Sequence, residues 1–76
     1  MICMAMEVIF SIHALERMEE RGIGKEEVLD VLRTPDYSIV TFKDRKIAIK
    51  VINFKTFQVV FKEEMGKIII ITAIVR

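Results

Sequence analysis

The sequence predicts one small α+β domain, in which two N-terminal helices pack on one face of an antiparallel, mostly meander sheet of four strands. The first observation is a change of period: apolar residues recur at helical spacing up to residue 33 and alternate as in strands from residue 37 onward. The second is the length of 76 residues, which suits a single domain over residues 1–76. The third is a hydrophobic content of 53%, which excludes an intrinsically disordered chain.

Two helices are expected in the first half of the chain. Residues 12–21 form the first, because Ser11 is a favourable N-cap and Gly22 suits the left-handed residue that ends a helix. Residues 24–33 form the second, which ends before Pro35. The residues expected to be buried are Ile12, Leu15 and Met18 in the first helix, and Val28, Leu29 and Leu32 in the second.

Strand-like runs follow one another closely after the helices. They cover residues 37–42, 46–52, 56–62 and 68–75, with a glycine-containing turn before the last one. Short links between consecutive strands favour antiparallel pairing of neighbours, which is a meander. Residues 7–10 resemble a short extra strand at the N-terminus, whose place in the sheet is left open.

Alternation along the strands assigns their two faces. The sets expected beneath the helices are fully apolar: Ile47, Ile49 and Val51 in one strand, and Phe57, Val59 and Phe61 in the next. On the opposite face, an apolar patch is expected from Val60, Ile68, Ile70 and Ile74. Because exposed apolar patches mark partner surfaces, a homodimer through the last strand is one interpretation.

Charge is distributed unevenly along the chain. Acidic residues outnumber basic ones in residues 1–36, and basic residues outnumber acidic ones in residues 37–76. A locally basic surface attracts phosphates, and the nucleic-acid-binding candidates are Arg45, Lys46 and Lys50. The other interpretation, which charge alone favours, is that these are solvated side chains that protect strand edges from aggregation.

The composition excludes several classes of protein. A lone cysteine, Cys3, forms no disulfide framework, and the chain lacks the clustered ligands of a zinc site. The longest uncharged run, between Lys67 and Arg76, is far shorter than the about 20 residues of a membrane-spanning helix. No cofactor motif is present, and the N-terminus lacks the positive region of a signal peptide. A cytoplasmic protein is therefore expected, with no cofactor, metal or membrane.

The residues that can carry chemistry are few. His13 is the only histidine, and histidine is the side chain that ordinarily titrates near neutral pH. Helical spacing places His13 and Arg17 on one line with Arg21 near it, which suits a phosphate. Thr72 is a polar residue in an apolar strand, where its hydroxyl can hold a phosphate. The plainer interpretation is a solvated helix face with ion pairs, and a threonine that suits a strand.

One stretch of the sequence is more distinctive than these residues alone. Residues 10–23 contain the pattern Ser-x-His-Ala-x-x-Arg-Met-x-x-Arg-Gly-Ile, which resembles the start of the domain-of-unknown-function family 4258. A helix ending near Pro35, a basic hairpin around residues 45–50 and the closing Ile-Thr-Ala at residues 71–73 extend this resemblance to residues 8–75. The chain departs from the pattern at Ile74, where an aromatic residue often follows.

The resemblance implies a function, because this family is similar to small RelE/ParE-type ribonuclease toxins. Those proteins combine helices with an antiparallel sheet and act on RNA without a metal. By resemblance, the catalytic residues are His13, Arg17, Arg21 and Thr72. RNA and an antitoxin-like protein are the implied partners. Two hypotheses remain: a metal-independent ribonuclease with His13 as general acid or base, and a non-enzymatic interaction module.

Overall fold

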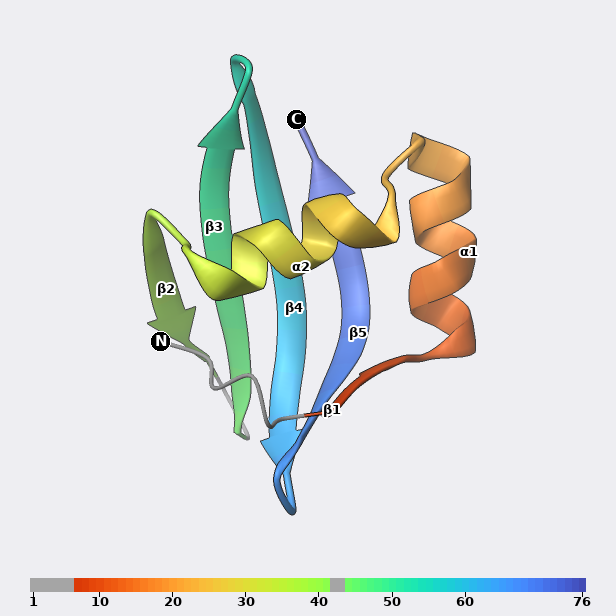
Figure 1. Cartoon of the computed structure of the whole chain (residues 1–76), viewed down its shortest axis with the longest axis vertical. Coiled ribbons are helices and arrows are strands. Elements are labelled where there is room, and N and C mark those ends of the chain that lie inside the picture. Colours follow the sequence, from red (N-terminus) through yellow and green to blue (C-terminus); the bar gives the residue numbers. More distant parts are fainter. Residues whose placement is uncertain (1–6, 42–43) are drawn as a thin grey trace.

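The computed structural model describes residues 7–41 and 44–76, and this part is an α+β fold of two helices and a five-stranded sheet (Figure 1). In chain order the elements are β1 (Glu7–Phe10), α1 (Ile12–Arg21), α2 (Lys25–Arg33), β2 (Tyr37–Val40), β3 (Arg45–Ile52), β4 (Lys55–Glu64) and β5 (Lys67–Val75). The predicted α+β class and both helices are confirmed. Residue 42 of an expected strand and Cys3 lie outside the described residues. Neither helix is long and apolar enough to cross a membrane.

The sheet has one more strand than predicted, and it is mixed. Its order is β1-β5-β4-β3-β2, with antiparallel pairing from β2 to β5 as expected for a meander. The four predicted strands form this antiparallel meander, but the sheet as a whole is mixed because the short N-terminal strand β1 pairs in parallel with β5. Val8 and Phe10 of β1 pack against the core, so the short strand covers an edge that the meander would leave open.

Helix α1 lies beside β5, at the edge of the layer that the helices form over the sheet (Figure 1). Its cap is as predicted: the Ser11 side chain accepts a hydrogen bond from Ala14 N, and Gly22 ends the helix at φ 69°. The expected stripe was mostly wrong, because Ala14 and Met18 are buried while Ile12 is 79% exposed. A helix at the edge buries only a narrow i, i+4 line.

Helix α2 crosses β3 and β4 and covers most of the core (Figure 1). Val28 and Leu32 are buried as predicted, together with Val31, while Leu29 is only half-buried. The helix begins with Gly24 N donating to the Glu27 carboxylate at 2.8 Å. This arrangement satisfies a backbone donor without the serine or threonine usual at that position.

The face of β4 beneath the helices is as predicted, but that of β3 is not. Phe57, Val59 and Phe61 belong to the core cluster. In β3 the core residue is Ala48, which pairs with Val59, whereas the set Ile47, Ile49 and Val51 lies on the opposite, open face of the sheet. The prediction placed Ala48 on the solvent face because Lys46 and Lys50, two positions away on either side, share its face of the strand. Long lysine side chains line a core edge while their charged ends reach polar partners.

Along β5, the set of alternating residues that points toward the helices changes part-way along the strand. The β4–β5 pairing shifts between Val60 and Phe61, so that Thr72 pairs with Val60 but Ile70 pairs with Phe61. Ile71 is the additional residue of this β-bulge. As a result Ile68 and Ile70 are 0% exposed beneath the helices, and the predicted patch that contained them was wrong.

Candidate nucleic-acid interface

A hollow of about 490 Å³ opens on the sheet face opposite α2, next to the start of α1. Its wall combines two polar residues at the start of α1, two cations from neighbouring strands and two isoleucines of β5. The lining residues are Ser11, His13, Arg45, Lys62, Ile69 and Ile71. The hollow therefore joins the only histidine to basic side chains of the sheet.

Sheet register places the two cations side by side. Arg45 in β3 pairs with Lys62 in β4, and Lys62 pairs with Ile69 in β5, so the three share one row on the open face. Lys62 Nζ also lies 3.4 Å from a Glu64 carboxylate oxygen, but both side chains are well exposed. An exposed ion pair of this kind contributes little, so it competes weakly with a phosphate.

The start of α1 is tied to the bulge of β5, which fixes His13 at the rim of the hollow. Ser11 N donates to Ile70 O at 3.3 Å, and the Ser11 hydroxyl lies 3.5 Å from Ile71 O. The same hydroxyl accepts from Ala14 N at 3.0 Å. These contacts hold the first turn of α1 against the strand that lines the hollow.

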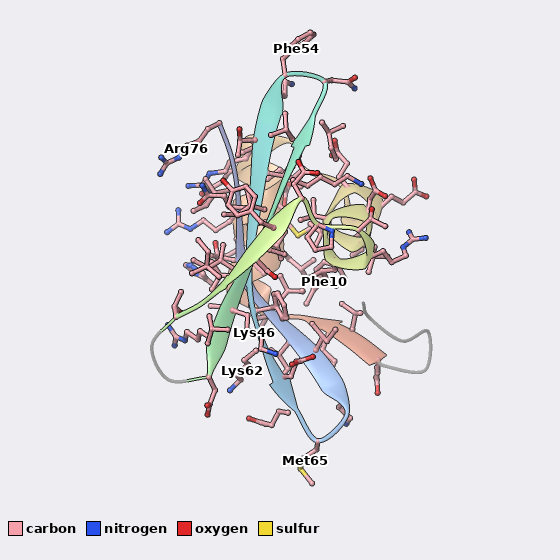
Figure 2. All side chains as sticks on the ribbon, turned by 90° about the vertical axis from the view of Figure 1, so that its left-hand side faces the viewer. Phe10, Lys46, Phe54, Lys62, Met65 and Arg76 are labelled. Carbon is pink, nitrogen blue, oxygen red and sulfur yellow. The ribbon has the colours of Figure 1, made fainter. Side chains whose placement is uncertain are left out.

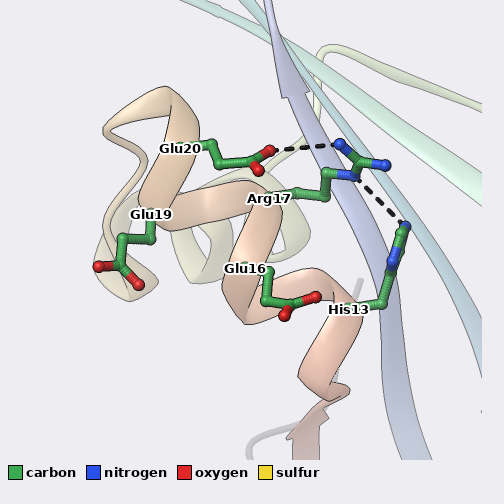
Figure 3. A pocket seen from close by; sticks show the side chains of 5 residues that line it. All are labelled: His13, Glu16, Arg17, Glu19 and Glu20. Atoms are coloured by element: carbon green, nitrogen blue, oxygen red, sulfur yellow. Dashed lines mark hydrogen bonds and ion pairs between the residues drawn. The ribbon is translucent and has the colours of Figure 1, made fainter.

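On α1, His13 faces Arg17 (Figure 3). Arg17 Nε donates to His13 Nε2 at 3.5 Å, and Arg17 Nη1 lies 3.2 Å from Glu20 Oε1. Glu16 and Glu19 line a pocket of the helix surface together with these residues, and Glu19 points away from the His13–Arg17 pair (Figure 3). His13 thus stands between an acidic helix flank and a basic sheet hollow. The hydrogen bond to His13 is at the long limit for such contacts, so an incoming group can replace it.

The structure separates the remaining predicted residues. Arg21 is exposed in the last turn of α1 and does not line the hollow. Thr72 is half-buried and pairs with Val60, beside the bulge residue Ile71 that lines the hollow. Its position is therefore adjacent to the hollow rather than inside it.

Lys46 and Lys50, predicted with Arg45 as nucleic-acid contacts, lie on the opposite face of β3. Lys50 Nζ is 2.7 Å from Thr34 Oγ1 and 3.2 Å from Asp30 Oδ2, near the C-terminal end of α2. Lys46 forms an ion pair with Glu63. Both lysines form contacts with other side chains on the helix side of the sheet, and neither lines the hollow.

The family model described as "Domain of unknown function (DUF4258)" matches residues 10–75. The chain belongs to the DUF4258 family. No curated protein and no solved structure matches this DUF4258 chain. The similarity to RelE/ParE-type toxins stays a prediction.

Sequence reasoning did not name Lys62 or Ser11 as site residues of this DUF4258 chain. A signal for Lys62 exists in the two-residue turn at Asn53 and Phe54, because a two-residue hairpin fixes the register of its strands. Counting back from that turn places Lys62 opposite Arg45. Ser11 was recognised as a cap, but its contact with Ile71 depends on a bulge that has no clear sequence signal.

Proposed function

We propose that this protein binds single-stranded RNA at the hollow and cleaves it without a metal ion. The observation that carries the proposal is that His13, Arg45 and Lys62 line one open hollow although they come from three different elements. Two cations on a rigid sheet suit a phosphodiester, and the histidine beside them suits proton transfer. RNA carries the 2′-hydroxyl that this chemistry uses as its nucleophile.

The charges around His13 set the direction from which RNA approaches. Glu16, Glu19 and Glu20 repel a polyanion from the outer side of α1, whereas Arg45 and Lys62 attract it from the open sheet face. A phosphate drawn to these cations comes within reach of the His13 ring at the rim. The acidic flank and the basic hollow together favour one binding orientation.

In the proposed reaction, the 2′ oxygen attacks the adjacent phosphorus while the bond from phosphorus to O5′ breaks. His13 takes the proton of the 2′-hydroxyl, and water supplies the proton of the leaving O5′. Arg45 and Lys62 stabilise the extra negative charge on the phosphate oxygens. Arg17 releases its hydrogen bond to His13 Nε2 when the RNA enters, which leaves this nitrogen free to accept the proton. Thr72 contacts the RNA strand beside the hollow. The products are a 2′,3′-cyclic phosphate and a 5′-hydroxyl.

RNA binding tests the first half of this proposal through two double variants that each remove two positive charges. Arg45→Gln with Lys62→Gln is expected to weaken binding of single-stranded RNA by about 100-fold or more, because hydrogen bonds to charged groups contribute about 1.5–3 kcal/mol each and two are removed. The slope of log affinity against log salt should fall by about 1.4, because each phosphate contact contributes about 0.7 for a single strand. Fluorescence anisotropy across a salt series measures both quantities.

The matched control replaces Lys46 and Lys50 by glutamine on the other face of β3. It changes the net charge by the same amount, so a purely global charge effect weakens both double variants alike. We expect the control to bind RNA as the wild type does. Equal losses in the two variants, or a wild type that does not bind RNA, would refute the proposed site.

A second candidate function, contact with a second copy of this chain, is favoured by the apolar character of the open sheet face. This face carries Tyr37, Ile39, Ile47, Val60 and Ile74 in two adjacent rows, with Ile49 buried between them. Tyr37 is 59% and Ile39 45% exposed, so the patch is accessible to a partner. Light scattering that finds a dimer in the wild type and a monomer in Ile39→Lys supports this function, and a wild-type monomer refutes it.

A further inference from the structure

Two tight turns each present one large apolar side chain to solvent. Phe54, between β3 and β4, is 102% exposed, and Met65, between β4 and β5, is 94% exposed. The two side chains stand at opposite ends of the molecule (Figure 2). Neither contributes burial to the core, so packing explains neither residue.

The backbone at Phe54 is also unfavourable for this residue type. Asn53 and Phe54 have φ values of 50° and 67°, and their flanking residues Ile52 and Lys55 pair with each other. Such a two-residue turn prefers asparagine followed by glycine, since both positions need positive φ. Asparagine fits its position, whereas phenylalanine occupies the one that glycine normally fills. In the β4–β5 turn, Gly66 fills that position.

The surroundings of Phe54 are basic. Lys55 follows it directly, and Arg76 exchanges two backbone hydrogen bonds of 2.9 Å with Thr56. Arg76 and Phe54 are seen at the same end of the molecule in Figure 2. Lys55 and Arg76 are exposed, and neither makes an ion pair with another described residue. An exposed aromatic ring beside two available cations is the combination that binds single-stranded nucleic acid, by stacking on a base and contacting phosphates.

We propose that Phe54 stacks on a base of the same RNA strand that occupies the hollow, while Lys55 and Arg76 contact its phosphates. This inference rests on the proposed function. Strand β3 joins the two places, with Arg45 at the hollow and Ile52 at the turn. Eight residues of strand correspond to about 25 Å, so only an RNA long enough to span that length reaches both.

The test measures binding of 2′-O-methyl RNA, which cannot be cleaved because its 2′-hydroxyl is blocked. Phe54→Ala is expected to weaken binding of a dodecamer by about 5- to 150-fold, the range for loss of one base stack. A tetramer, which is too short to leave the hollow, should bind the variant and the wild type equally. Phe54→Trp should bind like the wild type, and Phe54→Leu like the alanine variant, because leucine is apolar but offers no ring to stack on.

Two comparisons separate a function of Phe54 from a structural role. Met65→Ala removes the other exposed apolar tip and should leave RNA binding unchanged. Phe54→Gly relieves the unfavourable backbone and should raise the melting temperature by about 4 °C or more while weakening dodecamer binding as alanine does. A gain in stability with a loss of binding is expected only of a residue retained for contact with a ligand.

Several outcomes would overturn the inference while leaving the proposed function intact. If the double variant of Arg45 and Lys62 loses dodecamer binding while Phe54→Ala keeps it, the RNA occupies the hollow but does not contact the turn. If Phe54→Leu binds the dodecamer as tightly as the wild type, Phe54 does not stack on a base. It then makes only a general apolar contact, of the kind that would also suit a protein partner. A lower melting temperature of Phe54→Gly shows that the ring supports the fold. If the wild type binds no RNA, the proposed function and this inference fail together.

Discussion

Replacing Ile70 by alanine is expected to lower the free energy of unfolding by about 2–5 kcal/mol, the usual cost of removing a large buried aliphatic side chain. Ile70 is 0% exposed and lies in the core cluster beneath the helices. For a domain whose total stability is about 5–15 kcal/mol, this is a large fraction. Chemical denaturation followed by circular dichroism measures the change directly.

The neighbouring residue provides a matched control. Ile69→Ala removes the same atoms from the same strand, but Ile69 is half-buried on the open face and lines the hollow. We expect a cost of about 1 kcal/mol or less, as for a partly exposed position away from the core. If the two variants cost the same, or Ile69→Ala costs more, the assignment of faces before the β-bulge is wrong.

The helices could be predicted because their ends depend on local chemistry. Ser11 and Gly22 delimit α1 through contacts within a few residues of themselves, and Pro35 follows α2 closely. Such signals are present in the sequence regardless of what the rest of the chain does. The boundaries of β3, β4 and β5 were close to their predicted positions for the same reason, since turn residues separate the strands.

Which face each strand buries could not be predicted, because it depends on partners far away in the sequence. Lys50 is tolerated beneath α2 since Asp30 and Thr34 receive its charged end. The sequence shows a lysine, and alternation treats it as a mark of the solvent face. In β5 the additional residue Ile71 shifts the alternation by one. The residues of β5 that precede it therefore point to the face opposite to the one that simple alternation predicts.

Only part of the candidate site could be predicted, because its residues are brought together by strand pairing between distant parts of the sequence. The sequence singled out His13 and Arg45, and the structure brings them to one hollow. Arg21 and the two lysines of β3 lie elsewhere, because a helix edge and a strand face separate them from it. Lys62 joins the hollow through strand register, which is a property of the hairpin rather than of any short motif.

The second large effect is expected at His13. His13→Ala should lower the rate of RNA cleavage by about 10²–10⁴-fold, the usual contribution of a general acid or base. RNA affinity should change little, because Arg45 and Lys62 remain in the hollow. Single-turnover cleavage of a labelled oligonucleotide measures the rate, and anisotropy with uncleavable RNA measures the affinity.

Arg21→Ala is the matched control on the same helix. Arg21 is exposed and outside the hollow, so its loss should leave the cleavage rate unchanged. This outcome would also correct the role that the family resemblance implies for Arg21. Equal losses in the two variants would instead point to a general effect of altering α1.

The most direct measurement is the identity of the RNA product formed by purified protein in excess EDTA, followed by phosphorus NMR. We predict a 2′,3′-cyclic phosphate from the wild type and from Arg21→Ala, and almost none from His13→Ala at matched RNA occupancy. An equal amount of product from His13→Ala, or no product from a wild type that binds RNA, would contradict cleavage at this hollow.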